Sequence, residues 1–119
     1  MAAPNIVNVA TITGKSVTGA ITTSTSTLLQ NSASSNKVFK INTILISNVD
    51  GTNSATAAIS LYSGGTDRYI AKGISVPAGA TVVLIDKNSS LYLEEDKYIR
   101  GDASANGDLE FIISYEELS

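Results

Sequence analysis

The sequence has 119 residues, 43% of them hydrophobic, and a net charge of −3 with no histidine, cysteine or tryptophan. Without histidine and cysteine the chain lacks the usual acid–base group, the thiolate nucleophile and zinc–thiolate ligands, so we expect no enzyme, cofactor or metal site. An acidic chain is poorly suited to neutralise phosphates, and no apolar run approaches the roughly 18 residues of a membrane span. We therefore expect neither a nucleic-acid nor a membrane partner.

The first 36 residues differ from the rest because Lys15 is their only charged side chain. Residues 5–13, NIVNVATIT, alternate as a strand does, so we interpret residues 1–36 as an extended N-terminal arm with the first strand or strands. Such an arm either pairs with the open sheet edge of another chain or closes its own sandwich. If it pairs with another chain, we expect the partner contacts to come from Ile6, Val7, Val9 and Ile12.

Residues 37–119 form the predicted body, in which short alternating runs are separated by turn residues about every ten positions. This spacing predicts a single-domain, all-β antiparallel β-sandwich, jelly-roll-like in type. In the first run, KVFKINTILISNV, the apolar parity changes after Ile41, so either a bulge lies near Asn42 or both faces are buried. The later predicted strands are ATAAISLYS, RYIAKGISV after the turn Gly64-Gly65, ATVVLID, SSLYLEE, KYIRGDAS and DLEFIISYEEL.

The last two predicted strands, KYIRGDAS and DLEFIISYEEL, are separated by Asn106-Gly107. This dipeptide supplies the positive backbone angles that a tight hairpin turn needs. We therefore predict that these two strands pair with each other. Leu109, Phe111, Ile113 and Tyr115 are expected on one face of the last strand.

Three short motifs invite a functional interpretation. Arg100-Gly101-Asp102 is a tripeptide that adhesion receptors can bind. It falls within a predicted strand, where Arg100 and Asp102 share the solvent face, whereas receptor binding needs an exposed loop tip. We therefore interpret the tripeptide as a coincidence. DKNSS, at 86–90, imitates the start of a calcium loop without its glycine and glutamate, and is better explained as a turn. The acidic pairs at 94–95 and 116–117 point to opposite strand faces, which does not suit hydrolytic catalysis.

Tyr92 and Tyr98 bracket the segment LEEDK and are the residues that a ligand-binding interpretation would use. Aromatic rings stack on sugars, so a surface contact by these two side chains would indicate a glycan-binding, receptor-recognition module. The alternative is that both tyrosines cover a sandwich edge with the hydroxyl in water.

Three stretches resemble a known group of proteins: MAAPNIVNVATITGKS, SSNKVFKINTILISNVDGTN, and the final 45 residues from SVPAGATVVLIDK to FIISYEELS. They are similar to small β-rich virion structural proteins of tailed phages that infect cyanobacteria and other aquatic bacteria. The resemblance implies a particle component present in many copies. We therefore expect a virion protein on the capsid surface, a decoration (cement) protein that binds the major capsid protein as a trimer or dimer. A neck, tail or baseplate component is the alternative.

Overall fold

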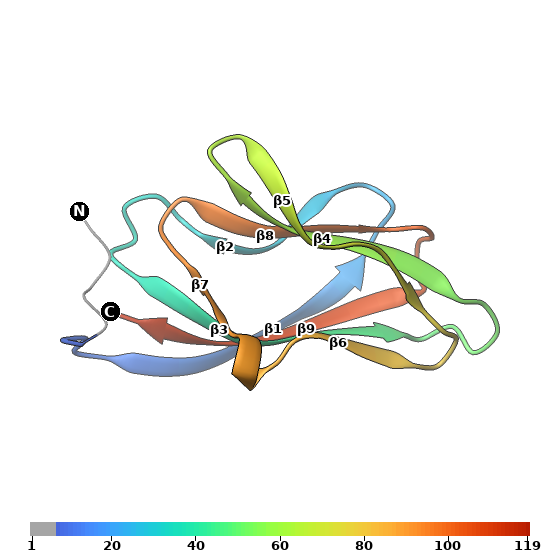
Figure 1. The fold of residues 1–119 in the computed structure, drawn as a ribbon, viewed down its shortest axis with the longest axis horizontal. Helices are drawn as coiled ribbons and strands as arrows, with labels where there is room; N and C mark the ends of the chain where they lie inside the picture. The colour runs from blue at the N-terminus through green and yellow to red at the C-terminus, as the bar shows by residue number, and fades with distance from the viewer. Residues whose placement is uncertain (1–6) are drawn as a thin grey trace.

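The computed structural model describes residues 7–119, which form two antiparallel β-sheets packed face to face (Figure 1). The all-β sandwich predicted from the sequence is confirmed. Among the described residues, no helix is both long and apolar enough to cross a bilayer. The elements are β1 (Ile12–Ile21), β2 (Ser26–Asn31), β3 (Val38–Asn48), β4 (Ala55–Ser63), β5 (Thr66–Val76), β6 (Thr81–Ile85), the 3-10 turn η1 (Lys87–Ser89), β7 (Leu91–Leu93), β8 (Lys97–Ala103) and β9 (Leu109–Leu118).

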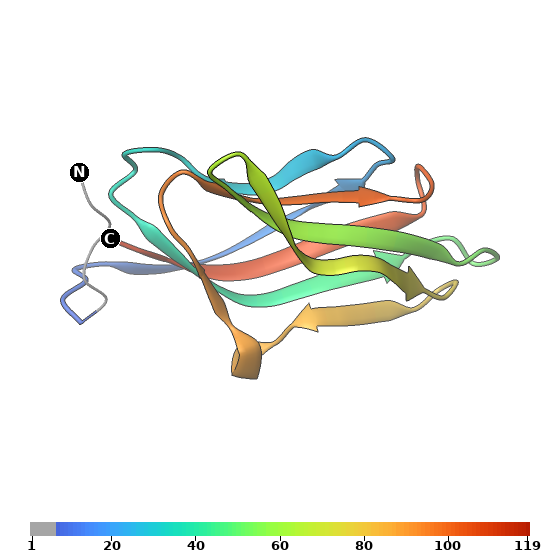
Figure 2. The ribbon, with the colours of Figure 1, turned by 45° about the horizontal axis from the view of Figure 1, so that its top comes forward.

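The strand order is that of a jelly roll. Sheet A has the order β1-β9-β3-β6, with the short β7 also paired to β3, and sheet B has the order β2-β8-β4-β5. Each connection from β1 to β4 crosses from one sheet to the other, which places β1 and β2 at one side of the sandwich. Figure 1 shows the two layers, with β2, β8, β4 and β5 above β1, β9, β3 and β6, and Figure 2, in which the top comes forward, shows β2, β8, β4 and β5 side by side in that order. Closing a double sheet in this way leaves four edge strands.

The first strands lie within residues 1–36, as expected, and they belong to the sandwich itself. β1 pairs along its whole length with β9, and β2 pairs with β8. Residues 12–31 are therefore part of the body. Of residues 7–36, the segment before Ile12 and the connections at 22–25 and 32–36 lie outside the sheets.

The core follows from the alternation of apolar residues along β3 and β9. The change of parity in β3 is caused by a bulge, because the register against β9 shifts between Ile41 and Thr43. Ile41, Ile44 and Ile46 are consequently all fully buried on the same face of the strand. Of the two alternatives that the sequence left open, the bulge at Asn42 is the one observed. The main core cluster also includes Ile21, Ile59, Val76, Leu93, Ile99, Leu109, Phe111 and Ile113.

The prediction that the last two strands form a hairpin is wrong. β8 lies between β2 and β4 in sheet B, whereas β9 lies between β1 and β3 in sheet A. The chain does turn at Gly107, whose φ is +83°, and the side chain of Asn106 accepts a hydrogen bond from the Thr23 N–H at 2.9 Å. The turn therefore reverses the chain between sheets, so that the apolar faces of β8 and β9 meet across the core instead of lying in one layer.

The Gly64-Gly65 prediction is confirmed. Both glycines have positive φ, +62° and +83°, and they join β4 to β5 as a hairpin within sheet B. Positive angles at both central positions give the turn whose twist matches that of the flanking strands.

Two buried asparagines connect the sheets, near the ends of β2 and β3. Asn31, fully buried in β2, donates from its amide to the carbonyl oxygens of Lys37 (2.9 Å) and Leu93 (3.0 Å). Asn48, 3% exposed in β3, donates to the carbonyl oxygen of Val76 in β5 at 3.0 Å. Each amide thus reaches from its own sheet to a strand of the other and donates to a main-chain carbonyl there.

Candidate interaction surface

The residues expected to contact a partner lie at and before the start of β1. Ile6 falls outside the described residues. Val7 and Val9 lie in turn and irregular structure, so the strand predicted for 5–13 is wrong for residues 7–11, and strand structure begins at Ile12. Val7 is 84% exposed and Ile12 is 61% exposed, whereas Val9 is half-buried.

The backbone of β1 has one side paired and one side open. Thr11 and Ser119 exchange both of their backbone hydrogen bonds, at 2.9 and 3.0 Å, and the β1–β9 register continues from there without a shift. Paired and unpaired residues alternate along an antiparallel strand, so the odd-numbered residues of β1 bond to β9. The N–H and C=O groups that point to the open side belong to Ile12, Gly14, Ser16, Thr18 and Ala20.

This open edge carries little that would prevent another strand from pairing with it. β1 is 10 residues long and contains no proline. Its single charged residue, Lys15, turns to the inner side of the sheet and pairs with Glu117. Natural edge strands are normally protected by charges, prolines, bulges or short length. β1 is long, regular and free of proline, and its one charge, Lys15, is paired with Glu117.

The other three sheet edges are protected. β5 has two register shifts against β4 and carries Asp67, Arg68 and Lys72. β2 has only 6 residues and a register shift between Thr27 and Leu29. β6 has only 5 residues and a register shift against β3. Within residues 7–119, β1 is therefore the only long and regular edge.

The outer face of sheet A beside β1 is partly apolar and carries the carboxylates of Glu110 and Glu116. A shallow hollow of about 350 Å³ lies there, lined by residues of β1 and β9 and by Ser47 of β3. Ile112 (41% exposed) borders it, and Val83 (55% exposed) lies further along the same face. Small side chains on the outer face of β1, among them Gly14 and Ala20, leave this area open.

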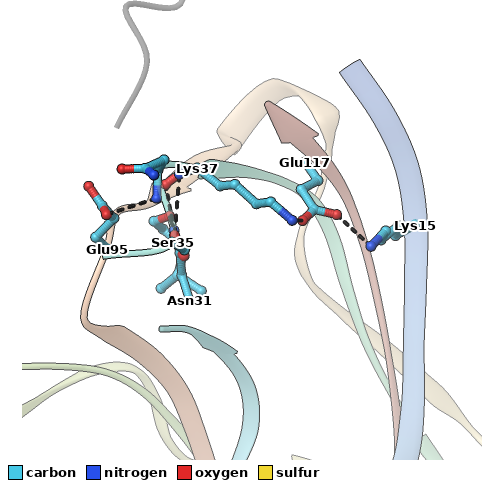
Figure 3. Close-up of polar contacts among 8 residues, drawn as sticks. Lys15, Asn31, Ser35, Lys37, Glu95 and Glu117 are labelled. Atoms are coloured by element: carbon cyan, nitrogen blue, oxygen red, sulfur yellow. Dashed lines mark hydrogen bonds and ion pairs between the residues drawn. The ribbon is translucent and has the colours of Figure 1, made fainter. Parts of the chain in front are cut away.

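An ion-paired carboxylate fixes one end of β1. Glu117 in β9 is 8% exposed, and its two oxygens contact the ammonium groups of Lys15 and Lys37, each at 2.5 Å (Figure 3). Hydrogen bonds from Lys15 and then Lys37 hold the pKa of Glu117 below its ordinary 4.5, against burial, which raises it. The hydrogen bond to Glu117 raises the pKa of Lys15 above 10.5. The group links β1, β9 and the start of β3.

We expect this group to make stability pH-dependent. The folded-state pKa of Glu117 is lower than its unfolded value, so its contribution is present above the unfolded pKa and is lost as pH falls through the folded pKa. Glu117→Gln should therefore flatten the fall in urea midpoint between about pH 6 and pH 3. The control is Glu110→Gln, an exposed carboxylate on the same strand, which should leave the slope unchanged. Equal slopes for Glu117→Gln and the wild type would contradict the expectation.

Tyr92 and Tyr98 do not form a common platform. Tyr92 pairs across from Lys40 on the outer side of sheet A, 44% exposed. Tyr98 lies in sheet B, where its ring stacks on Tyr62 with centroids 5.4 Å apart, and Arg100 covers the Tyr62 ring at 4.5 Å. The two tyrosines that bracket LEEDK thus face away from each other, and the stacked rings support the sheet surface.

The Arg-Gly-Asp tripeptide is held inside a strand, as expected. Arg100 Nε approaches Asp67 Oδ1 at 3.7 Å, and Asp102 accepts a hydrogen bond from the Thr25 hydroxyl at 2.9 Å. Gly101 is buried and faces the core. Neither charge is presented at a loop tip, which is what receptor reading would need.

The remaining acidic candidates have local structural roles. Asp86 accepts hydrogen bonds from the N–H groups of Asn88 (2.9 Å) and Ser89 (3.2 Å), which confirms a turn at DKNSS. Glu94 pairs with Lys97 at 2.6 Å, and Glu95 accepts from the Asn36 N–H at 3.0 Å. Within residues 7–119, no three metal-ligating side chains come together.

Comparisons with known proteins show a shared fold. No protein-family model and no curated protein matches the sequence. A solved chain described under "Bacillus endospore appendages form a novel family of disulfide-linked pili" is similar in structure, with a TM-score of 0.52 and 14% sequence identity over 91% of this chain and 87% of that one. At this identity the likeness concerns the arrangement of the strands, and it confirms the β-sandwich.

Proposed function

We propose that this chain is a non-catalytic structural subunit of a multi-copy particle, specifically a phage capsid decoration protein. In this function it binds the outer surface of the major capsid protein lattice and stabilises the head. The observation that carries the proposal is the open edge of β1, which is long and regular and has its one charge, Lys15, paired with Glu117, in a sandwich whose other edges are protected. An unprotected edge on a natural protein suits a strand from a neighbour.

The mechanism is strand addition between neighbouring subunits of the particle, repeated over many sites. Main-chain hydrogen bonds along β1 supply affinity, and the small outer side chains of Gly14, Ser16 and Ala20 let a neighbouring strand lie flat. The segment with Val7 and Val9 stands outside the sheet and adds apolar contacts. The binding free energy of each contact is modest, and the stabilisation of a shell comes from the large number of such contacts.

Location tests this proposal. An antibody raised against the purified chain is expected to label intact particles from cultures that express the gene, in negative-stain images. Quantitative mass spectrometry of those particles is expected to give hundreds of copies, whereas a dozen or fewer would identify a neck, tail or baseplate component. Absence from purified particles overturns the proposal.

A filament subunit is the second candidate, and the likeness to the appendage pilus chain favours it. That protein is described as disulfide-linked, whereas this chain contains no cysteine, so its copies would be joined without disulfides. Labelling along extended fibres instead of on capsids separates this candidate from a decoration protein.

Deleting residues 1–9 tests the arm. The cut keeps Ala10 and Thr11, whose N–H groups bond to the Ser119 carbonyl at 2.8 and 2.9 Å, so the end of β9 stays capped. We expect the truncated chain to fold and to bind particles about tenfold more weakly or worse, a loss of about 1.4 kcal/mol. The measurement is co-sedimentation with particles. The control replaces residues 1–9 with a Gly/Ser sequence of equal length, and unchanged affinity in both would show that the arm is not an anchor.

A further inference from the structure

We propose that two copies of this chain pair through their β1 strands, antiparallel about a two-fold axis, so that sheet A runs continuously through both. This deepens the function proposed above, on which it rests, because it names a second copy as the partner of the open edge. Three observations carry the dimer: the unpaired main-chain N–H and C=O groups on the outer side of β1, the protection of the other sheet edges, and the order of side chains along β1.

The identity of the partner follows from the comparison of edges. Pairing between copies needs a long, regular edge on each of them, and β1 is the only such edge within residues 7–119. A copy therefore has to offer the same strand that it pairs with. Use of one edge by both partners gives a closed, two-fold dimer and not a growing fibre.

The register follows from the parity of the open groups and from charge. Only even-numbered residues of β1 have free N–H and C=O groups, so each hydrogen-bonded pair between copies must join two even-numbered residues. If Ser16 pairs with Ser16 of the second copy, all five even-numbered residues of β1 are used, and Ile12 of each copy lies opposite Ala20 of the other. This register sets Lys15 across from Val17. Centring on Lys15 instead would bring the two ammonium groups together, which is unfavourable.

The outer face of sheet A fits the same register. Ile12 of the second copy lies opposite Ala20, on the face where the hollow of about 350 Å³ is lined by Ala20, Thr18 and Ile112. Strands in a sheet are about 4.8 Å apart, so the branched side chain of Ile12 reaches the rim of this hollow. The symmetry repeats the contact, so the exposed Ile12 of each copy is covered.

Cysteine cross-linking tests the dimer and its register, because the chain has no cysteine of its own. Ser16→Cys places two thiols at one hydrogen-bonded pair, where the Cα atoms are about 5.5 Å apart, a separation that a disulfide spans. Thr18→Cys is the matched control on the same strand and face, since its counterpart in the second copy is Gly14. We expect Ser16→Cys to give roughly tenfold more cross-linked dimer than Thr18→Cys on mild oxidation.

Ser16→Pro provides the second measurement. Proline removes an N–H that points to the open edge and is tolerated on that side of an edge strand, so β1 stays paired with β9. Native mass spectrometry of the purified wild type is expected to show twice the 12.4 kDa of one chain, and Ser16→Pro the single mass with an unchanged circular dichroism spectrum. A wild type that stays monomeric at every concentration, or equal cross-linking at positions 16 and 18, overturns the dimer. Both tests use purified chain, so their failure is distinct from a failure of particle labelling.

Discussion

Gly101→Val is expected to lower the free energy of unfolding by about 3 kcal/mol. A Cβ at this position in β8 would lie 2.8 Å from Ile59 Cδ1 and 3.1 Å from Leu28 Cδ1. It would also lie 3.2 Å from the carbonyl oxygen of Ala58, which is backbone and yields less than a side chain does. The branched valine adds two further methyl groups to this packed region, so β8 or the strands beside it must shift. Urea unfolding followed by circular dichroism measures the loss.

The control for this change is Gly51→Val. Nothing lies within 4 Å of a Cβ at Gly51, in the connection between β3 and β4, so we expect a change below about 0.5 kcal/mol. The comparison also bears on the Arg-Gly-Asp tripeptide, since a large effect at Gly101 shows that its glycine serves packing. Equal stabilities for the two variants would mean that the space around Gly101 is larger than described.

Asn31→Ala is expected to cost about 3 kcal/mol, because it removes the three hydrogen bonds of a fully buried side chain, each worth about 1 kcal/mol. The carbonyl oxygens of Lys37 and Leu93 lose their donor, and the Ser35 hydroxyl loses the acceptor that it contacts at 2.5 Å. These groups fix the segment between β2 and β3 and connect it to β7. We expect a lower melting temperature together with faster hydrogen exchange in residues 32–37.

Asn88→Ala is the matched control for this prediction. Asn88 is exposed in η1, and the local turn is held by its backbone N–H, which the substitution keeps. We expect a change within about 0.5 kcal/mol. If Asn31→Ala were equally mild, water would have to replace the lost amide, and exchange in residues 32–37 would then stay slow.

Local signals in the sequence predicted several elements of the fold correctly. The parity change after Ile41 in β3 left a bulge or burial of both faces as alternatives, and the register against β9 shows the bulge; Gly64-Gly65 marked the β4–β5 hairpin. These features could be predicted because residues adjacent in sequence determine the backbone angles of a turn and the alternation of side chains along a strand. The same reasoning placed the apolar face of β9, from Leu109 to Ile113, in the core.

Strand pairing was less predictable, because a turn reverses the chain without choosing a partner for it. Asn106-Gly107 does mark a turn, but β8 and β9 lie in different sheets and pack their apolar residues into one shared core. Similarly, the alternation in residues 5–13 continues before Ile12, yet the pairing with β9 extends only to Ala10 and Thr11, which bond to Ser119, and residues 7–9 lie in turn and irregular structure. These outcomes depend on contacts between distant residues.

The candidate surface was only partly visible in the sequence. Ile12 was expected among the contact residues and lies on the open edge, whereas the importance of Ser16 and Thr18 required knowledge of which β1 groups already bond to β9. Glu117 was expected to point away from Glu116, but its partners Lys15 and Lys37 are distant in sequence. The one available signal that Glu117 points inward was its spacing, because residues 113, 115 and 117 of a strand share one face.

The asparagines near the ends of β2 and β3 affect how the sandwich carries mechanical load. Dispersion contacts between two apolar layers have little directionality, so on their own they resist sliding weakly. Asn31 and Asn48 add directional bonds from each layer to the other, and these bonds must stretch before one layer slides past its neighbour. A force applied tangentially to β1 is therefore transmitted to both layers, and the sandwich responds as a single stiff plate.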